Sequence, residues 1–278
     1  MRIMVTGAAG QLGSTVAARM ASRYDVTAFT RDRLDIADEA AVMGAVTAVA
    51  PHFVINCAAY NDVDGAEDDP RSAIQANALG VLSLARAAAA CGAILVHYST
   101  DFVFDGRAQE PYVETDPPRP LSSYGSSKLL GEWFALEAPA AYVLRVESLF
   151  GGRPATSSVD NILDGLRRGV QVRVFHDRTI TPSYVHDVAM ATEGLMERRP
   201  PPGIYHCVNG SATTWVHLAE TAARLLRSHA EIVPVSVHEV QLRAVRPQYC
   251  ALSNEKLKDV GIEMPVWEDA LARHVTSL

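Results

Sequence analysis

The chain has 278 residues, of which 48% are hydrophobic, and its formal net charge is −7. The apolar fraction is large enough to build an extensive core, which excludes an intrinsically disordered chain. The negative charge argues against non-specific binding of nucleic acid, so we expect no nucleic-acid partner.

The first half of the chain alternates short β-like runs with helical patterns. Strands are predicted at 3–6, 26–29, 53–56, 94–98 and 142–146, and helices at 11–22, 39–49, 70–91 and about 123–137. Strands that alternate with helices predict a parallel, doubly wound α/β sheet of the Rossmann type. We therefore expect residues 1–150 to form a dinucleotide-binding domain.

The second half, residues 151–278, has a less regular pattern. Helices are predicted at 159–168, 185–198, 217–226 and 265–274, and a strand at 204–208. The run Pro200-Pro201-Pro202 predicts a turn or a linker. We expect this half to form mainly a smaller substrate-binding lobe, with some elements returning to the main sheet.

Cysteine usage and apolar runs bear on the cellular location. The four cysteines lie far apart and form no Cys-x-x-Cys pair, which is typical of a reduced, cytoplasmic protein. The apolar run after Arg2 stops at Gly7, too early for a signal peptide. The alanine-rich stretch around Ala87 is interrupted by Arg86, so we expect no membrane association.

A glycine-rich turn follows the first predicted strand. Glycine permits a tight turn and a close approach of the backbone to a pyrophosphate, and the next helix directs free N–H groups at the anion. The spacing of three between glycines matches the short-chain dehydrogenase variant of this turn. Its place between a strand and a helix favours a dinucleotide site over a plain turn. The expected cofactor-binding residues here are Gly7, Gly10, Gln11, Leu12 and Gly13.

The end of the second strand predicts the choice of dinucleotide. NAD-binding proteins place an acid there for the ribose hydroxyl, whereas this chain has Arg31, which can pair with a 2′-phosphate. The prediction is therefore NADPH, with NADH still allowed because Asp32 follows; a solvated arginine is the alternative. Asp35 and Ile36 are expected to flank the adenine.

The third strand is followed by small residues that would let a cofactor lie across the strand ends. Ala58, Ala59 and Tyr60 are the expected contacts, although ordinary close packing explains the two alanines equally well. Asn77 lies within the long helix that follows. We include it in the cofactor site, where it would act through a water or a backbone group, with a buried helix amide as the alternative.

Three residues form a candidate catalytic set. Tyr124 and Lys128 are four residues apart and share one helix face. A free tyrosine has a pKa near ~10, and a neighbouring cation stabilises its phenolate, so the pair suits proton transfer to a ketone oxygen. Lys128 can also bind the nicotinamide ribose. Thr100, at the end of the fourth strand, would hold the substrate carbonyl through its hydroxyl.

Several motifs together resemble the dTDP-4-dehydrorhamnose reductase family of the extended short-chain dehydrogenases. They are the Gly7–Gly13 turn, residues 54–60, the run Ser99-Thr100-Asp101-Phe102-Val103-Phe104-Asp105-Gly106, residues 120–132, Leu144-Arg145, Thr181–Tyr184 and Arg246-Pro247. The resemblance covers nearly the whole chain. It implies catalytic roles for Thr100, Tyr124 and Lys128, and hydride transfer to C4 of a dTDP-4-keto-6-deoxyhexose to give dTDP-L-rhamnose.

One segment departs from the family pattern. Where the family usually has Thr-Ser-Trp-x-Tyr-Gly after Leu-Arg, this chain has Val146-Glu147-Ser148-Leu149-Phe150-Gly151. Because that segment should approach the sugar, a different deoxysugar or stereochemistry is an open alternative. Some members bind a divalent metal through glutamates, but no acid occurs near Ser14 and Thr15 and no histidine pair has ligand spacing, so we predict no metal.

The substrate is predicted to be a nucleotide sugar with its own pyrophosphate. Arginine side chains match phosphate oxygens, and four arginines are candidates, although a solvated surface position is the alternative for each: Arg153, Arg178, Arg243 and Arg246. Tyr184 would stack on the base or line the sugar pocket, or else be a core aromatic. The predicted substrate-binding residues are Thr100, Asp101, Val103, Glu147, Arg153, Tyr184 and Arg246.

Two other functions remain open at this point. One is a reductase or epimerase of another nucleotide ketosugar, which would share the fold and the catalytic set. The other is a non-catalytic NADP-binding regulatory subunit, which the presence of Thr100, Tyr124 and Lys128 disfavours. We expect a monomer or a homodimer.

Overall fold

A six-stranded sheet organises the structure, a computed structural model that describes residues 1–278. Its strands are β1 (Arg2–Thr6), β2 (Asp25–Phe29), β3 (Phe53–Asn56), β4 (Ile94–Thr100), β5 (Ala141–Val146) and β10 (Gly203–His206). They lie in the order β10-β5-β4-β3-β1-β2, and every pairing is parallel. The predicted α/β class is confirmed. The connections change direction beside β1, and a crevice forms at the carboxyl ends of the strands at such a point.

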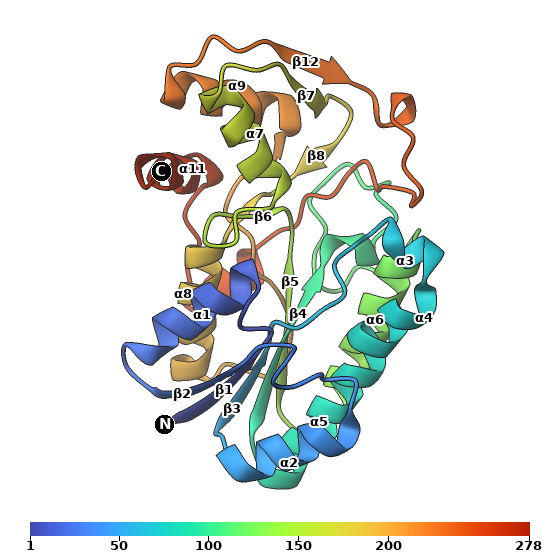
Figure 1. Ribbon diagram of the computed structural model, residues 1–278, viewed down its shortest axis with the longest axis vertical. Coiled ribbons are helices and arrows are strands. Elements are labelled where there is room, and N and C mark those ends of the chain that lie inside the picture. Colours follow the sequence, from blue (N-terminus) through green and yellow to red (C-terminus); the bar gives the residue numbers. More distant parts are fainter.

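Helices cover both faces of this sheet (Figure 1). The helices α1 (Gln11–Ala21) and α8 (Val185–Arg198) lie on one face, and α2 (Glu39–Val49), α5 (Gly80–Cys91) and α6 (Ser123–Ala135) on the other. Along β1, Val5 packs with Val16 on the face covered by α1 and α8, whereas Met4 packs with Leu84 on the opposite face. Successive strand side chains point to opposite faces, so a sheet covered on both sides needs apolar residues at every position.

The long helix predicted at 70–91 is continuous but irregular. It consists of α4 (Pro70–Ile74), a π-helical turn at Gln75–Leu79 and α5. By length and composition, this stretch could cross a membrane, and half of its most apolar window is buried inside the fold, as in the core helix of a globular protein. π-helical turns occur mostly at functional sites, and this one contains Asn77.

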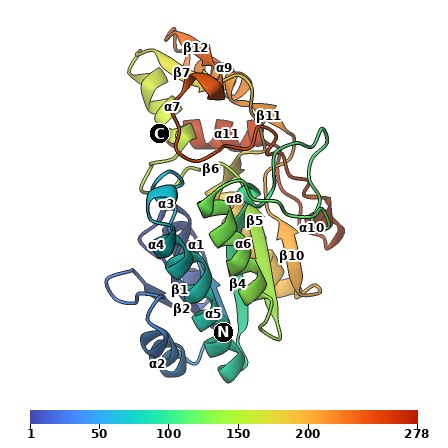
Figure 2. The same cartoon turned by 90° about the vertical axis from the view of Figure 1, so that its right-hand side faces the viewer.

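The second half of the chain contributes to two parts of the molecule, the six-stranded sheet with its helices and a separate lobe. Strand β10 and helix α8 belong to the sheet layer, as described above. The other long elements form a separate lobe above the strand ends, built from α7 (Ser158–Arg167), β7 (Val172–Phe175), α9 (Trp215–Leu226), β12 (Ile232–Val235) and α11 (Trp267–Thr276) (Figure 2). The lobe has its own core around Leu163 and Trp267.

Short elements join the lobe to the sheet. Two-stranded pairs form between β6 (Leu149–Phe150) and β9 (Ser183–Tyr184), and between β8 (Thr179–Ile180) and β11 (Thr213–Thr214). Single turns of helix lie at α3 (Gly65–Asp68), η2 (Asp101–Val103), η3 (Val237–Glu239) and α10 (Glu255–Asp259). Elements this short show no periodicity in a sequence, which is why none of them was predicted.

Candidate active site

A continuous cleft runs along the carboxyl ends of the strands, under the second lobe. One cavity of about 500 Å³ lies over β1, β2 and β3, and another of about 550 Å³ lies over β4 and β5 and reaches the lobe. The two cavities meet at Gly10, Cys57, Ala58, Ala59 and Asn61, which line both of them. We call the first the cofactor groove and the second the sugar-end cavity.

The glycine turn lies where the two cavities join. Gly7 has a φ of +67°, and a Cβ on it would lie 2.5 Å from the backbone nitrogen of Ala58. A Cβ on Gly13 would lie 2.2 Å from the carbonyl oxygen of Gly7. Helix α1 begins after Gly10 with no side-chain cap and no acid in its first turn, so its N–H groups stay available for an anion. The turn therefore has the cradle that a pyrophosphate needs.

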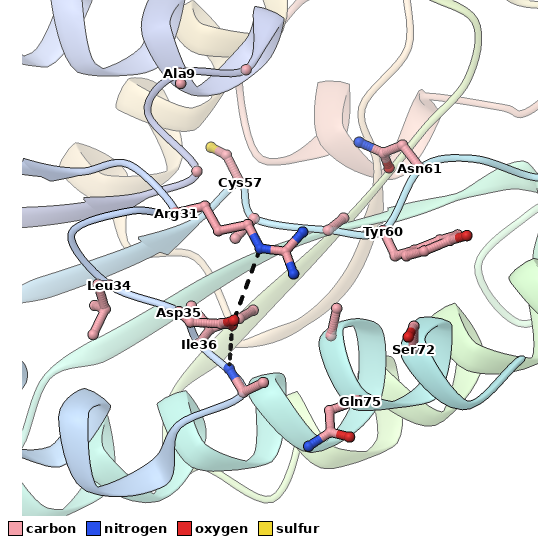
Figure 3. Close-up of a pocket in the computed structure, with 16 residues that line it drawn as sticks. Ala9, Arg31, Leu34, Asp35, Ile36, Cys57, Tyr60, Asn61, Ser72 and Gln75 are labelled. Atoms are coloured by element: carbon pink, nitrogen blue, oxygen red, sulfur yellow. Dashed lines mark hydrogen bonds and ion pairs between the residues drawn. The ribbon is translucent and has the colours of Figure 1, made fainter. Parts of the chain in front are cut away.

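Arg31 extends over the cofactor groove, with Asp35 below it (Figure 3). The Arg31 side chain is 89% exposed, and its Nε lies 3.8 Å from Asp35 Oδ2. Ile36 lines the same groove beneath them. A loose, solvated ion pair of this kind contributes little free energy, so the guanidinium can turn to a phosphate at small cost.

The loop after β3 forms the far wall of the groove with Ala58, Ala59 and Tyr60. Asn77 lies behind this wall and lines neither cavity, as its predicted indirect role through a backbone group requires. Its Oδ1 accepts the Tyr60 N–H at 2.8 Å, and its Nδ2 donates to the Tyr60 carbonyl at 3.0 Å and to Ser127 Oγ at 3.0 Å. The π-helical turn thus lets one amide fix the groove wall to helix α6.

Thr100, Tyr124 and Lys128 converge in the sugar-end cavity, and all three side chains are buried. Helix α6 begins at this place because Ser122 caps it by accepting the Gly125 N–H at 3.1 Å. Lys128 Nζ donates to the Tyr98 carbonyl at 2.6 Å, which fixes the ammonium behind β4. Burial lowers the pKa of Lys128 to about 8.

The phenol of Tyr124 keeps its proton at neutral pH. Burial raises its pKa above the usual value, and the nearby Asp101 carboxylate raises it further. The neighbouring Thr100 hydroxyl, which donates to Asp101 Oδ1 at 3.0 Å, acts in the opposite direction and lowers the pKa of Tyr124. A protonated phenol beside a cation and a hydroxyl is the arrangement that a proton donor to a ketone oxygen requires.

The second lobe supplies the opposite wall of the sugar-end cavity through Arg178, Trp215 and Arg246. Arg178 is buried, and its Nε donates to the Pro247 carbonyl at 3.0 Å. Arg246 pairs with Asp64 at 2.9 Å. The buried atoms Trp215 Nε1 and Asp101 Oδ2 have no hydrogen-bond partner in the protein. Buried polar groups are almost always paired, so these two atoms indicate where a ligand would bind.

A further cavity of about 450 Å³ extends from this wall into the lobe. It shares Ser158, Arg178 and Trp215 with the sugar-end cavity. Arg168, Arg173 and Phe175 also line it. Arginines next to an aromatic ring suit phosphates and a base.

Several residues predicted from the sequence to bind substrate lie elsewhere. Val103 is packed in a small core cluster, and Arg153 is exposed outside the cavities. Tyr184 stacks on Phe150, with ring centroids 5.3 Å apart, inside the lobe core, so the core alternative is right. Glu147 is buried behind Ser148 and does not line the cavity.

Arg243 likewise lies away from the cleft, in an exposed pair with Asp68. Conversely, the sequence did not single out Cys57, Ser148 or Trp215 as lining residues, although all three line the sugar-end cavity. For Ser148, the departure after Arg145 was a signal that pointed to the segment without indicating the residue. Trp215 opens a helix in the distant lobe, and nothing in its local sequence marks it.

The chain is similar to known proteins in both sequence and structure. The family described as "RmlD substrate binding domain" matches residues 1–278. A dTDP-4-dehydrorhamnose reductase of Streptomyces griseus is 36% identical, over 100% of this chain and 94% of that protein. A Streptomyces antibioticus protein, "Probable dTDP-4,6-dihydroxy-2-methyloxan-3-one 4-ketoreductase", is 36% identical over 98% and 93%. The crystal structure of a dTDP-4-dehydrorhamnose reductase from Bacillus anthracis in complex with NADP superposes with a TM-score of 0.95, at 32% identity over 100% and 99% of the chains.

Proposed function

Because the chain belongs to the RmlD substrate-binding family over its whole length, we propose that it reduces the C4 keto group of dTDP-4-dehydro-L-rhamnose to give dTDP-L-rhamnose. The chain is an oxidoreductase of the extended short-chain dehydrogenase type, with NADPH as its cofactor. The observation that carries the proposal is the convergence of Thr100, Tyr124 and Lys128 in the cavity that continues the cofactor groove.

The residues of the cleft fit NADPH. The bare glycine turn would hold the pyrophosphate, and Arg31 would pair with the 2′-phosphate. Tyr60 and Ile36 would enclose the adenosine between them. When bound, the reduced nicotinamide supplies the hydride that reduces the carbonyl carbon.

The protein supplies the proton. The Thr100 hydroxyl, which donates to Asp101 Oδ1 at 3.0 Å in the structure, would turn to the carbonyl oxygen of the substrate and hold it beside Tyr124. As negative charge develops on that oxygen, the Tyr124 hydroxyl transfers its proton to it and becomes a phenolate. The Lys128 ammonium, on the same helix face, stabilises this phenolate until solvent returns the proton. The product is the alcohol, and the enzyme recovers its phenol.

The nucleotide of the substrate would lie in the cavity that extends into the lobe. Arg178 stands where this cavity meets the sugar-end cavity, and Arg168 and Arg173 follow. This spacing would place the diphosphate at Arg178, with the sugar towards Tyr124 and the base near Phe175. The buried Arg178 guanidinium, which lines both of these cavities, would select a nucleotide-linked sugar over a free sugar.

A second candidate function is 4-keto reduction of a different dTDP-linked deoxysugar. It is favoured by Ser148 at the cavity wall, where the family pattern has a large aromatic residue, and by the name of the Streptomyces antibioticus relative. We further propose a cytoplasmic location, since none of the four cysteines is paired. A monomer or a homodimer remains the prediction for the oligomeric state.

The test is NADPH consumption over a panel of nucleotide sugars. We expect the fastest turnover with dTDP-4-dehydro-L-rhamnose and an L-rhamno product by NMR. Preferred turnover of another dTDP-4-ketosugar would support the second function instead. Absence of turnover with every 4-ketosugar, in a protein that binds NADPH, would contradict both.

A further inference from the structure

Ser148 occupies an unusual place at the wall of the sugar-end cavity. It lies two residues after the end of β5, is half-buried and lines the cavity. Its φ is +43°, in the left-handed region that a residue with a side chain rarely adopts. Strained backbone of this kind persists only where surrounding contacts enforce it, and such residues cluster at functional sites.

Contacts from the buried Glu147 hold Ser148 in this conformation. Glu147 Oε1 lies 2.5 Å from Ser148 Oγ, and Glu147 Oε2 accepts the N–H of Thr181. The Glu147 carbonyl also accepts the Ser183 N–H at 3.1 Å. The turn is therefore clamped between the end of β5 and the segment before β9. Glu147 is 2% exposed and does not itself line the cavity, whereas Ser148 does.

Three titratable groups from other elements face Glu147. Asp101 comes from η2, Arg178 from the segment before β8, and Cys250 from the C-terminal part of the chain. Burial keeps the Cys250 thiol neutral by raising its pKa. The Arg178 guanidinium donates to the Pro247 carbonyl and to Cys250 Sγ and forms no ion pair with either acid. Two buried carboxyl groups therefore lie near each other without a paired cation, which favours the neutral form of one of them. Burial, with a further contribution from Asp101, raises the pKa of Glu147 to about 8, above the value of about 6 for Asp101.

The position of that proton follows from the hydrogen bonds. Because Oε2 of Glu147 accepts the Thr181 N–H, the proton of the neutral acid lies on Oε1. The structure has Ser148 Oγ donating to Oε1 at 2.5 Å, which is the arrangement for an ionised Glu147. In the neutral acid the proton on Oε1 would instead be donated to Ser148 Oγ across the same distance, which is typical of a strong O–H···O bond. The hydroxyl hydrogen of Ser148 is then free to donate into the cavity. If Glu147 ionises, the same hydrogen turns back to the carboxylate, and only oxygen lone pairs face the cavity.

We propose that Glu147 is a positioning residue that sets the Ser148 hydroxyl as a hydrogen-bond donor to an oxygen of the sugar substrate. The specificity-determining contact is made by Ser148, and ionisation of Glu147 reverses its polarity. The proposal rests on the proposed function, because it assumes a ketosugar in this cavity. It assigns a purpose to the strained turn and to a buried acid that the chemical step does not use.

The first test compares pH profiles of KM for the sugar nucleotide. Glu147→Gln keeps an acceptor for Thr181 and a donor for Ser148 but cannot ionise. In the unsubstituted protein we expect KM to rise about two- to tenfold between pH 7 and pH 9, the value of one hydrogen bond. In Glu147→Gln, KM should stay low and flat, and in Ser148→Ala it should be high and flat. Loss of charge on Lys128 acts on kcat and affects every variant alike.

Glu193→Gln is the matched control. Glu193 is also a buried acid, but it pairs with Arg19 and Arg23 and lines neither the cofactor groove nor the sugar-end cavity. Its neutralisation should lower stability and leave the pH dependence of KM unchanged. A KM that is flat in the unsubstituted protein, or that still rises in Glu147→Gln, would overturn the proposal. If Glu147→Gln does not fold, Ser148→Ala retains the test, since an unchanged KM at pH 7 also overturns it.

A second readout needs no substrate. Infrared spectra of the protein recorded against pH should contain a protonated-carboxyl band that disappears near pH 8 and is missing in Glu147→Gln. A protein that has this band but turns over no ketosugar would refute the proposed function and leave the protonation of Glu147 intact. A protein that reduces a ketosugar without the band would refute the inference alone.

Discussion

The two ends of the cleft recognise their ligands by different means. The cofactor groove is largely backbone: a bare glycine turn, the free N–H groups of α1 and the small residues after β3, with Arg31 as its single flexible cation. The sugar-end cavity is walled by buried side chains from segments distant in the chain, among them Asp101, Arg178 and Trp215. Backbone groups of the first kind bind the pyrophosphate of a cofactor that many enzymes share. A wall of side chains, in contrast, allows substrate specificity to change when single residues are replaced.

The largest effect is expected in the sugar-end cavity, at the proton donor. Tyr124→Phe removes the proton donor but keeps the ring that packs edge-on against Phe102. We expect kcat to fall about 10²- to 10⁴-fold, because general acid catalysis contributes that much. NADPH affinity should change less than about tenfold, since only the hydroxyl is lost. Steady-state kinetics with fluorescence titration of NADPH measures both, and unchanged turnover would remove Tyr124 from the mechanism.

Cofactor binding can be tested by a substitution that distorts the backbone of the glycine turn. In Gly13→Ala, the new Cβ would lie 2.2 Å from the Gly7 carbonyl oxygen, so the phosphate turn must distort. NADPH affinity should fall about ten- to a hundredfold, the value of one charge-assisted hydrogen bond. Gly44→Ala is the matched control, because nothing lies within 4 Å of the added Cβ in helix α2. It should raise stability by about 0.5–1 kcal/mol and leave NADPH affinity unchanged.

The selectivity of the cofactor end rests on Arg31. Arg31→Ala should raise the NADPH dissociation constant about ten- to a hundredfold and that of NADH far less, because only NADPH carries the 2′-phosphate. Arg33→Ala serves as the control, since Arg33 lies over the Phe29 ring and does not line the groove. Parallel titrations of each variant with NADPH and with NADH measure the two dissociation constants. Equal losses for NADH and NADPH would mean that Arg31 does not bind the 2′-phosphate.

The smallest effect is expected at the lobe wall. Trp215→Phe removes an indole N–H that has no partner in the protein. If this N–H binds the substrate, KM for the sugar nucleotide should rise about two- to tenfold, with NADPH affinity unchanged. Trp267→Phe, in the core of the same lobe, should lower the melting temperature without a change in KM. A Trp215→Phe enzyme with unaltered KM would place the substrate away from this wall.

The sequence predicts the cofactor end well because its signals are local. A glycine turn between a strand and a helix, or a basic residue after the second strand, means the same thing in any doubly wound sheet. The turn, Arg31, Thr100, Tyr124 and Lys128 all lie in the cleft for this reason. Asn77 was placed in the right region, but only the π-helical turn explains how it acts through Tyr60.

The lobe wall could not be predicted in the same way. Whether an arginine or an aromatic residue reaches the cavity depends on how two-residue strands dock the lobe on the sheet. Residue type therefore favoured four arginines and Tyr184 alike. The docking of the lobe brought only Arg178 and Arg246 of these to the wall, together with Trp215, which residue type had not marked. The position of Ser148 at the wall depends on a left-handed turn that the buried Glu147 holds in place. No pattern of residues in the sequence predicts that turn.

The most direct test of the two-ended cleft is a crystal structure of the protein with NADP and the reduced sugar nucleotide. We expect the 2′-phosphate at Arg31, the nicotinamide beside Lys128, and the sugar C4 oxygen within about 2.6–3.2 Å of the Tyr124 hydroxyl. The nucleotide diphosphate should contact Arg178. A complex with the nicotinamide outside the sugar-end cavity, or with the C4 oxygen out of reach of Tyr124, would contradict it.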